Sequence, residues 1–300
     1  MNANPAITRF DSYLHELASN YVSLPDKPDE NAQVTIGALW HCAAGHPKSA
    51  AAVEDAPLPP LDAAGETRMA ALIARRVAGE PLAYITGLQR FMGLELLASP
   101  AAMIPRRETE LLGAAAIACA RQLAAPTLTV LDICAGSGNL SCAIASQVPG
   151  AHIHAADISA DAVALARRNI ERCGFQDRIE AQAGDFLKPF ETPQFLGKVD
   201  LIVCNPPYIS AQKRQSMATE IARYEPSQAF DGGPLGINLL NRLIREAPLF
   251  LRSGGMLAFE LGLGQGRAVC QRVNRSELLE LISTAEDDGG HIRAVVARRR

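Results

Sequence analysis

The spacing of apolar residues along the chain changes near residue 100. Before that point apolar residues recur at helical spacing, as at Phe10, Leu14, Leu17, Met69, Leu72, Ile73 and Val77. Gly79-Glu-Pro81 is expected to stop the last of these helices. Beyond residue 100, short runs rich in β-branched residues alternate with helical patterns. The pattern predicts a small helical domain over residues 1–95, a connecting segment to about residue 110, and an α/β domain over residues 111–300.

The second part of the chain contains six short apolar runs that are typical of strands. They lie at residues 127–132, 152–157, 179–185, 199–205, 255–260 and 292–297. A helical pattern at residues 160–173 follows the second run, with Ser159 placed as N-cap and Gly174 just past the end. Strands that alternate with helices predict right-handed crossovers and a mostly parallel sheet.

Composition narrows the classes of function. The formal net charge is −3, so general electrostatic attraction does not favour binding to nucleic acid. The seven cysteines are scattered without the spacing of zinc ligands, which indicates a reduced, cytoplasmic protein with no metal site. We see no signal peptide at residues 1–10. The apolar run at residues 111–120 is too short to span a bilayer, which requires a helix of about 20 residues.

Candidate cofactor residues follow the first predicted strand. That strand ends at Asp132 and leads into the glycine-rich turn Cys134, Ala135, Gly136, Ser137 and Gly138. A dinucleotide site requires a third glycine, where this chain has Ser141, and Asp132 would repel a pyrophosphate. The same carboxylate suits the ammonium group of S-adenosylmethionine, so we expect that cofactor.

Two further strand ends carry side chains that suit the rest of this cofactor. Asp157 ends the second strand, where a carboxylate can accept both ribose hydroxyls. Asp185 and Phe186 end the third, where an acid can accept the adenine amine and an aromatic ring can cover the base. Each acid taken alone could equally be a strand-end or capping residue. Their recurrence on successive strands favours binding.

The stretch Asn205, Pro206, Pro207 and Tyr208 follows the fourth strand at the same mouth of the sheet. The prolines have no N–H, so the turn presents carbonyl groups, and Asn205 adds a side-chain carbonyl. Such a turn can accept both hydrogens of an amide –NH2 group and favour a pyramidal nitrogen as the methyl group arrives. Tyr208 is expected to lie flat against the planar group, a role that does not require its hydroxyl.

Asn205-Pro-Pro-Tyr208 resembles the signature of amino-methyltransferases, and the wider sequence is similar to the HemK-type glutamine N5-methyltransferases. The resemblance covers roughly residues 68–297. Besides the turn it rests on the segments 79–87, 104–110 and 224–226, on Gly232 and Gly236, and on Glu260-Leu-Gly262 with Gln265.

The resemblance implies a seven-stranded Rossmann-like S-adenosylmethionine methyltransferase core, with an N-terminal helical domain that helps to seat a protein substrate. It implies methylation of a glutamine in a peptide-release factor or a ribosomal protein. Arg107 stands where the release-factor type has proline, and Cys134-Ala135 is closer to the ribosomal-protein type, so both partners stay open. Two other functions are also open: methylation of an exocyclic amine in nucleic acid, and cofactor binding without catalysis.

Overall fold

The computed structural model describes residues 5–19, 27, 30–54, 56–123, 125–209, 219–230, 232 and 236–300. The chain forms two compact units, and its path crosses between them three times. One comprises Met1–Pro100 with Ala218–Glu225, and the other comprises Ala101–Met217 with Pro226–Arg300. The second stretch of the first unit, which falls in the middle of the α/β sequence, has no counterpart in the prediction from hydrophobic spacing.

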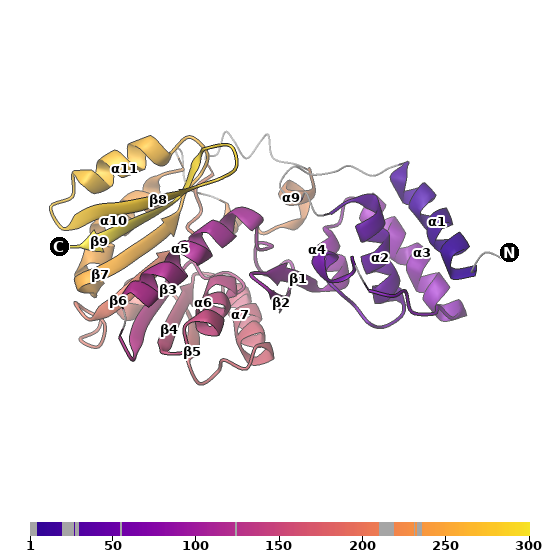
Figure 1. The fold of residues 1–300 in the computed structure, drawn as a ribbon, viewed down its shortest axis with the longest axis horizontal. Coiled ribbons are helices and arrows are strands. Elements are labelled where there is room, and N and C mark those ends of the chain that lie inside the picture. Colours follow the sequence, from indigo (N-terminus) through magenta and orange to yellow (C-terminus); the bar gives the residue numbers. More distant parts are fainter. Residues whose placement is uncertain are drawn as a thin grey trace. The chain divides into compact units, whose positions relative to one another are not determined.

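The first unit is mainly helical (Figure 1). Its elements are α1 (Pro5–Ala18), α2 (Ala32–Ala43), η1 (Ala50–Ala52), α3 (Ala63–Val77), α4 (Leu82–Thr86), the hairpin β1 (Leu88–Phe91) and β2 (Leu94–Leu97), and α9 (Thr219–Tyr224). Asn31 and Asp62 cap α2 and α3 by accepting backbone N–H bonds, and Trp40 and Met69 lie fully buried between the helices. Helix α3, which contains Met69 and Val77, ends just before Gly79-Glu-Pro81 as expected. It is not the last helix of the unit, however, because α4 begins directly after Pro81. Proline has no N–H to lose at a helix start, so it can precede a new helix as well as end an old one.

Buried ion pairs hold α9 in this first unit. Glu220 accepts hydrogen bonds from Lys27 and from Arg76, the latter at 2.8 Å, and all three side chains are buried. The paired cations lower the pKa of Glu220, although burial alone would raise it. A buried carboxylate with two cationic partners fixes the position of a helix that is too short to be stable alone.

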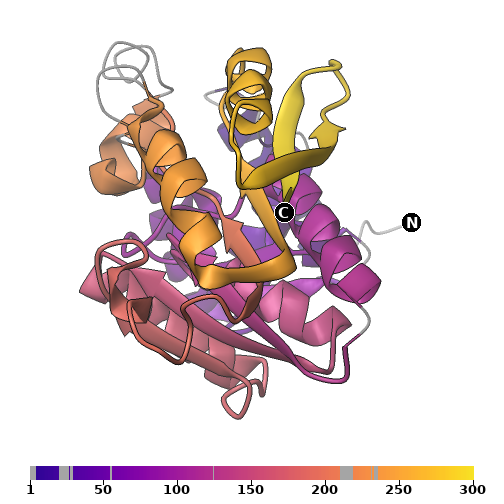
Figure 2. The ribbon, with the colours of Figure 1, turned by 90° about the vertical axis from the view of Figure 1, so that its left-hand side faces the viewer.

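The second unit is a seven-stranded sheet with helices packed against it. Its elements are α5 (Arg107–Leu123), β3 (Leu128–Ile133), α6 (Asn139–Gln147), β4 (Ala151–Asp157), α7 (Ala160–Arg172), β5 (Ile179–Ala183), η2 (Lys188–Phe190), β6 (Val199–Cys204), η3 (Ser227–Ala229), α10 (Asn238–Phe250), β7 (Leu251–Glu260), α11 (Gly266–Asn274), β8 (Leu279–Glu286) and β9 (Ile292–Arg299). The order is β5-β4-β3-β6-β7-β9-β8, with β3 to β7 parallel and β8 and β9 antiparallel to their neighbours. Helices cover both faces, with α10 opposite α5 (Figure 2).

The six predicted strands and one helix are present, with shifted ends. Helix α7 has its predicted cap, because the Ser159 side chain accepts the Ala162 N–H, and Gly174 follows at φ +73°. Strand β5 ends at Ala183, two residues before Asp185, and β7 begins at Leu251, four residues before the predicted start. Residue spacing missed β8, because much of this edge strand is exposed and lacks an apolar run.

The order of the strands locates the crevice in which a ligand is expected to bind. From β3 the chain builds the sheet outward through β4 and β5, and then returns to the other side of β3 with β6. Ligands in such sheets bind beyond the carboxyl ends of the strands where the order reverses. Ile133 and Cys204 are register partners at that edge, so the turns that begin at Cys134 and Asn205 leave the sheet side by side.

Candidate active site

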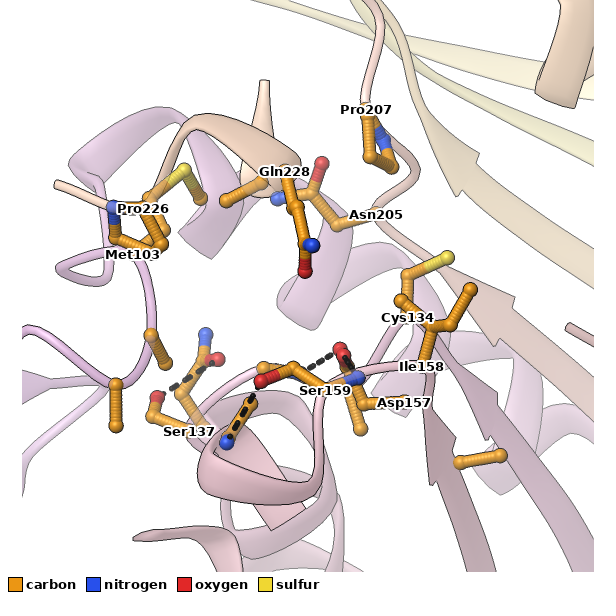
Figure 3. Close-up of a pocket in the computed structure, with 18 of the residues that line it drawn as sticks. Met103, Cys134, Ser137, Asp157, Ile158, Ser159, Asn205, Pro207, Pro226 and Gln228 are labelled. Carbon is orange, nitrogen blue, oxygen red and sulfur yellow. Dashed lines mark hydrogen bonds between the residues drawn. The ribbon is translucent and has the colours of Figure 1, made fainter. Parts of the chain in front are cut away.

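A cavity of about 400 Å³ lies at this edge of the sheet, in the second unit (Figure 3). Most of the side chains predicted to bind cofactor or substrate line it: Cys134, Ala135, Gly136, Ser137, Asp157, Asp185, Phe186, Asn205 and Pro207. Asn205 and Pro207 lie across the cavity from Ser137 and Asp157 in Figure 3. Asp132, Gly138, Pro206 and Tyr208 are not among the lining residues. The structure therefore joins the two predicted sites into one cavity.

The turn after β3 has an unusual backbone. Cys134 has φ +61°, and Phe186, which also lines the cavity, has φ +59°. With Met92 they are the non-glycine residues at positive φ in the described part of the chain. Such strained residues cluster at functional sites. Gly138, at φ +75°, leaves little space for a side chain, since a Cβ would lie 3.1 Å from that of Ala166. Its role is to pack the turn against α7.

Asp157 connects the first two strand ends. Its Oδ2 accepts the Gly136 N–H at 2.9 Å and its Oδ1 accepts the Ser159 N–H at 2.9 Å. Burial raises the pKa of Asp157, against the effect of these backbone hydrogen bonds. Each carboxylate oxygen has a second lone pair, so the side chain can still accept two hydroxyl groups from a ligand in the cavity.

Asp185 and Phe186 line the cavity with much of their capacity already in use. Asp185 accepts hydrogen bonds from Arg242 and Lys188, each at 2.7 Å, and these bonds lower its pKa. The Arg242 guanidinium also lies 4.8 Å from the Phe186 ring centroid, as a cation–π contact. Phe186 is 5% exposed. Both side chains therefore line the cavity while in contact with Arg242, and their contact with adenine stays a prediction.

Asp132 does not have the place that the sequence suggested. Its side chain is fully buried, and its Oδ2 accepts the Ser141 N–H at 3.1 Å and the Ser141 hydroxyl at 2.6 Å. Burial raises the pKa of this carboxyl to about 7, although the hydrogen bonds from Ser141 act in the opposite direction. Asp132 therefore holds the first turn of α6 under the glycine-rich turn and does not face a ligand.

The turn after β6 presents the Asn205 amide to the cavity. Its Nδ2 donates a hydrogen bond to the Thr109 hydroxyl at 3.2 Å. Thr109 comes from α5 and is 1% exposed. Because the Asn205 nitrogen is held there, the side-chain oxygen is the group left to accept a hydrogen bond from a ligand. Pro206 is buried behind the turn, whereas Pro207 borders the cavity.

The Tyr208 hydroxyl has a role that the sequence did not indicate. It donates a hydrogen bond of 2.7 Å to Oε1 of Glu260, a side chain that is 1% exposed at the end of β7. Burial raises the pKa of Glu260 to about 7, opposed by hydrogen bonding from Tyr208 and Thr109. A buried carboxyl group requires such donors, so the hydroxyl anchors the tyrosine to β7.

Several other residues line the cavity, although the spacing of residues along the sequence did not place them there. They are Ala101, Ala102 and Met103 before α5, Ile158 and Ser159 after β4, and Pro226, Gln228, Ala229 and Leu239. Of these, Ile158 could have been found from the sequence, since it directly follows the strand-end acid Asp157. Its side chain is 70% exposed. A large apolar side chain left open beside a cavity suits a flat apolar ring.

The described residues contain neither a membrane-spanning helix nor a cluster of metal-binding side chains. No helix there is long and apolar enough to cross a membrane. No group of three or more histidine, cysteine, aspartate or glutamate side chains there could hold a metal ion. All seven cysteines are free thiols.

Family models match both parts of the chain. The methyltransferase small domain matches residues 113–237, which include the cavity's glycine-rich turn and the turn at Asn205. The PrmC N-terminal domain matches residues 52–87, which include α3 and α4.

Solved structures share the fold. The hMettl16 catalytic domain, in complex with a 3′UTR hairpin, superposes with a TM-score of 0.52 at 16% identity, over 75% of this chain and 81% of that one. At that identity the likeness concerns the fold alone, and it agrees with the seven-stranded methyltransferase core expected from the resemblance.

Curated relatives cover nearly the whole chain. The release factor glutamine methyltransferase of Geobacter sulfurreducens is 37% identical over 92% of both chains. Those of Moorella thermoacetica and Salmonella typhimurium are 35% and 34% identical, over 92% and 96% of this chain and 93% and 98% of theirs. With the methyltransferase core and the cavity in place, this similarity confirms the resemblance seen in the motifs: the chain belongs to the release factor glutamine methyltransferase family.

Proposed function

We propose that this protein transfers a methyl group from S-adenosylmethionine to the side-chain amide nitrogen of a glutamine in a peptide-release factor. The observation that carries the proposal is the position of the Asn205 amide. It borders the same cavity as Asp157, and Thr109 holds its nitrogen so that its oxygen is available. Membership of the family favours a release factor over a ribosomal protein as the substrate.

The residues at the Asp157 end of the cavity fit the cofactor. Asp157 can accept the two ribose hydroxyls, because each oxygen has a lone pair left after its bond to a backbone N–H. The exposed Ile158 provides an apolar surface for the adenine ring. S-adenosylmethionine, when bound, supplies an electrophilic methyl group next to a positive sulfur.

The residues at the Asn205 end suit a poor nucleophile. The lone pair of an amide nitrogen is delocalised, as it is in the peptide bond. The Asn205 oxygen can accept one N–H of the substrate and the carbonyl of Pro206 the other, which holds the nitrogen and favours its pyramidal form. Pro207 narrows the cavity beside them. Catalysis then depends on position and preorganised dipoles, without a strong base.

The helical unit is the proposed site of substrate recognition. A family model named for an N-terminal domain matches part of that unit, separately from the model that matches the core. A family-specific helical domain attached to a widespread fold is suited to selecting a partner.

The cytoplasm is the proposed compartment of the protein. The seven free thiols agree with a reducing compartment.

Incubation with tritiated S-adenosylmethionine tests the proposal directly. The mixture should contain a purified, unmethylated release factor, or the same factor with its candidate glutamine replaced by alanine. We expect label in the first protein, located on a glutamine by mass spectrometry, and none in the second. Label that appears only with added nucleic acid and disappears on nuclease treatment would favour methylation of an exocyclic amine instead. Cofactor binding with no label in any sample would leave a binding protein.

A further inference from the structure

Gln265 lies directly behind the turn that carries Asn205 and Tyr208. It is the N-cap residue of α11, and its carboxamide makes three hydrogen bonds, none of them within the helix. Its Oε1 accepts the Gly262 N–H at 2.8 Å. Its Nε2 donates to the Tyr208 carbonyl at 3.1 Å and to the Gly236 carbonyl at 3.1 Å.

The partners fix the orientation of this carboxamide without ambiguity. Gly262 offers a backbone N–H, which can only donate, whereas Tyr208 and Gly236 offer carbonyl oxygens, which can only accept. Of the common side chains, a carboxamide supplies one acceptor and two donors at one terminus. A glutamate of the same shape would keep the bond to Gly262 and lose both others, and its carboxylate would face two carbonyl oxygens.

The two carbonyls held by Gln265 belong to the two ends of one excursion of the chain. After Tyr208 the chain runs through α9, which belongs to the other compact unit, and returns to the second unit before Gly236. Backbone bonds pair the two ends, from Ile209 N–H to the Phe230 carbonyl at 3.1 Å and from Gly232 N–H to the Ile209 carbonyl at 3.0 Å. Gln265 thus joins the base of the excursion to the start of α11.

Close packing shows that this base tolerates little displacement. A Cβ at Gly232 would lie 2.8 Å from the Gly236 Cα and 2.9 Å from both the Pro207 carbonyl oxygen and the Tyr208 Cα. A Cβ at Gly262 would lie 2.9 Å from the Tyr208 ring. Real Cβ atoms do not come so near, so both positions require glycine. The turn is therefore seated against backbone on two sides, and Gln265 bonds it from a third.

We propose that Gln265 is a positioning residue for methyl transfer, which sets the distance and angle of the Pro206–Tyr208 backbone by holding the Tyr208 carbonyl. This inference rests on the proposed function, because it concerns the placement of the glutamine-binding turn. Gln265 does not line the cavity, so its contribution passes through Tyr208 and leaves the cofactor end intact. A displacement of about 1 Å at a reacting centre can reduce the rate about a hundredfold.

The test compares Gln265→Glu with Gln265→Met in the full chain. The first keeps one hydrogen bond and loses both donations, and the second has similar length and loses all three. We expect kcat for methylation of a release factor to fall about 10- to 100-fold in both variants. The KM for the release factor and the affinity for S-adenosylmethionine, measured by calorimetry, should stay within about twofold, since neither surface loses a contact.

Gln271→Glu is the matched control, because Gln271 is exposed on the same helix and receives the same change of charge. It should keep wild-type kcat, and circular dichroism should show all three variants folded at the assay temperature. Wild-type kcat in Gln265→Glu, or a lowered kcat accompanied by an equal loss of cofactor affinity, would overturn the positioning role. If Gln265→Glu does not fold, the same criteria apply to Gln265→Met. If the wild-type enzyme methylates no release factor, the proposed function is refuted. The positioning role of Gln265 is then refuted with it, whatever the fold and the cofactor affinity of the variants.

Discussion

The two ends of the cavity keep their shape by different means. At the cofactor end, the loops after β3 and β4 are joined by contacts between near neighbours at the strand ends, chiefly from Gly136 and Ser159 to Asp157. At the turn after β6, the supporting side chains come from distant parts of the chain: Thr109 on α5, Glu260 at the end of β7 and Gln265 at the start of α11. The loops after β3 and β4 can thus be joined within one β-α-β unit, whereas the turn after β6 depends on the whole sheet being assembled.

Substitutions at the two ends of the cavity should therefore impair different steps, cofactor binding at one end and methyl transfer at the other. Loss of a group at the cofactor end should weaken binding while the turn keeps its geometry. Loss of a group at the turn should lower the rate with the cofactor still bound.

Asn205→Ala should lower kcat by about two to three orders of magnitude, as with the loss of one preorganised hydrogen-bonding group at a reacting centre. Pro206 and Pro207 still fix their φ angles, so the backbone of the turn should persist. The lost contact strengthens as the nitrogen becomes pyramidal, which confines the effect mainly to the transition state. Single-turnover rates at saturating cofactor measure it. Wild-type chemistry in this variant would exclude the mechanism proposed here.

Asp157→Ala should weaken S-adenosylmethionine binding by about 1.5–3 kcal/mol, the range for hydrogen bonds to a charged group. Its kcat at saturating cofactor should change much less than that of Asn205→Ala, because the turn is untouched. Isothermal calorimetry on the folded variant decides the first point, and rates at high cofactor concentration the second. Unchanged affinity would remove Asp157 from the cofactor site.

Tyr208→Phe should destabilise the fold by about 1–3 kcal/mol, since the buried Glu260 carboxyl loses one of its hydrogen-bond donors. Tyr224→Phe provides a control: that hydroxyl donates to the Ala78 carbonyl at 3.2 Å at an exposed position, so its loss should cost less. Denaturant unfolding followed by circular dichroism compares them. Equal stability of Tyr208→Phe and wild type would show that the hydroxyl does not anchor the turn, and would return the residue to a role through its ring alone.

Asp132→Asn should change the dependence of stability on pH. The folded pKa of Asp132 is about 7, above the ordinary 3.8, so between these values the folded state holds a proton that the unfolded chain has released. Its contribution is fully present below pH 3.8 and is lost as the pH rises through about 7. The stability of wild type relative to the variant should therefore fall across this window, by at most about 1.4 kcal/mol per pH unit.

The same variant also separates a supporting carboxylate from a binding carboxylate at the cofactor end. Because Asp132 supports α6 from beneath and does not line the cavity, Asp132→Asn should weaken cofactor binding less than Asp157→Ala. A larger loss in Asp132→Asn would restore the contact with the ammonium group that the sequence suggested.

The features that depend on local order could be predicted from the amino-acid sequence alone. The strand cores could be recognised because most of their residues are buried and apolar, as in β3 and β6. Ser159 and Gly174 bounded α7 because caps act on the nearest backbone groups. The glycine-rich turn, Asp157 and Asn205 could be placed in one site, since parallel strands deliver their carboxyl ends to the same edge of the sheet.

Tertiary structure decided which of those side chains face the cavity and what holds them. No spacing rule could reveal that Asp132 points beneath its turn to Ser141, or that Arg242 occupies Asp185 and Phe186. Nor could it show that α9 belongs to the helical unit, where Lys27 and Arg76 pair with Glu220. Local sequence fixes backbone conformation within a few residues. The direction of a buried polar side chain depends instead on which partners the assembled sheet and helices bring to it, since a buried polar group is stable only where it finds them.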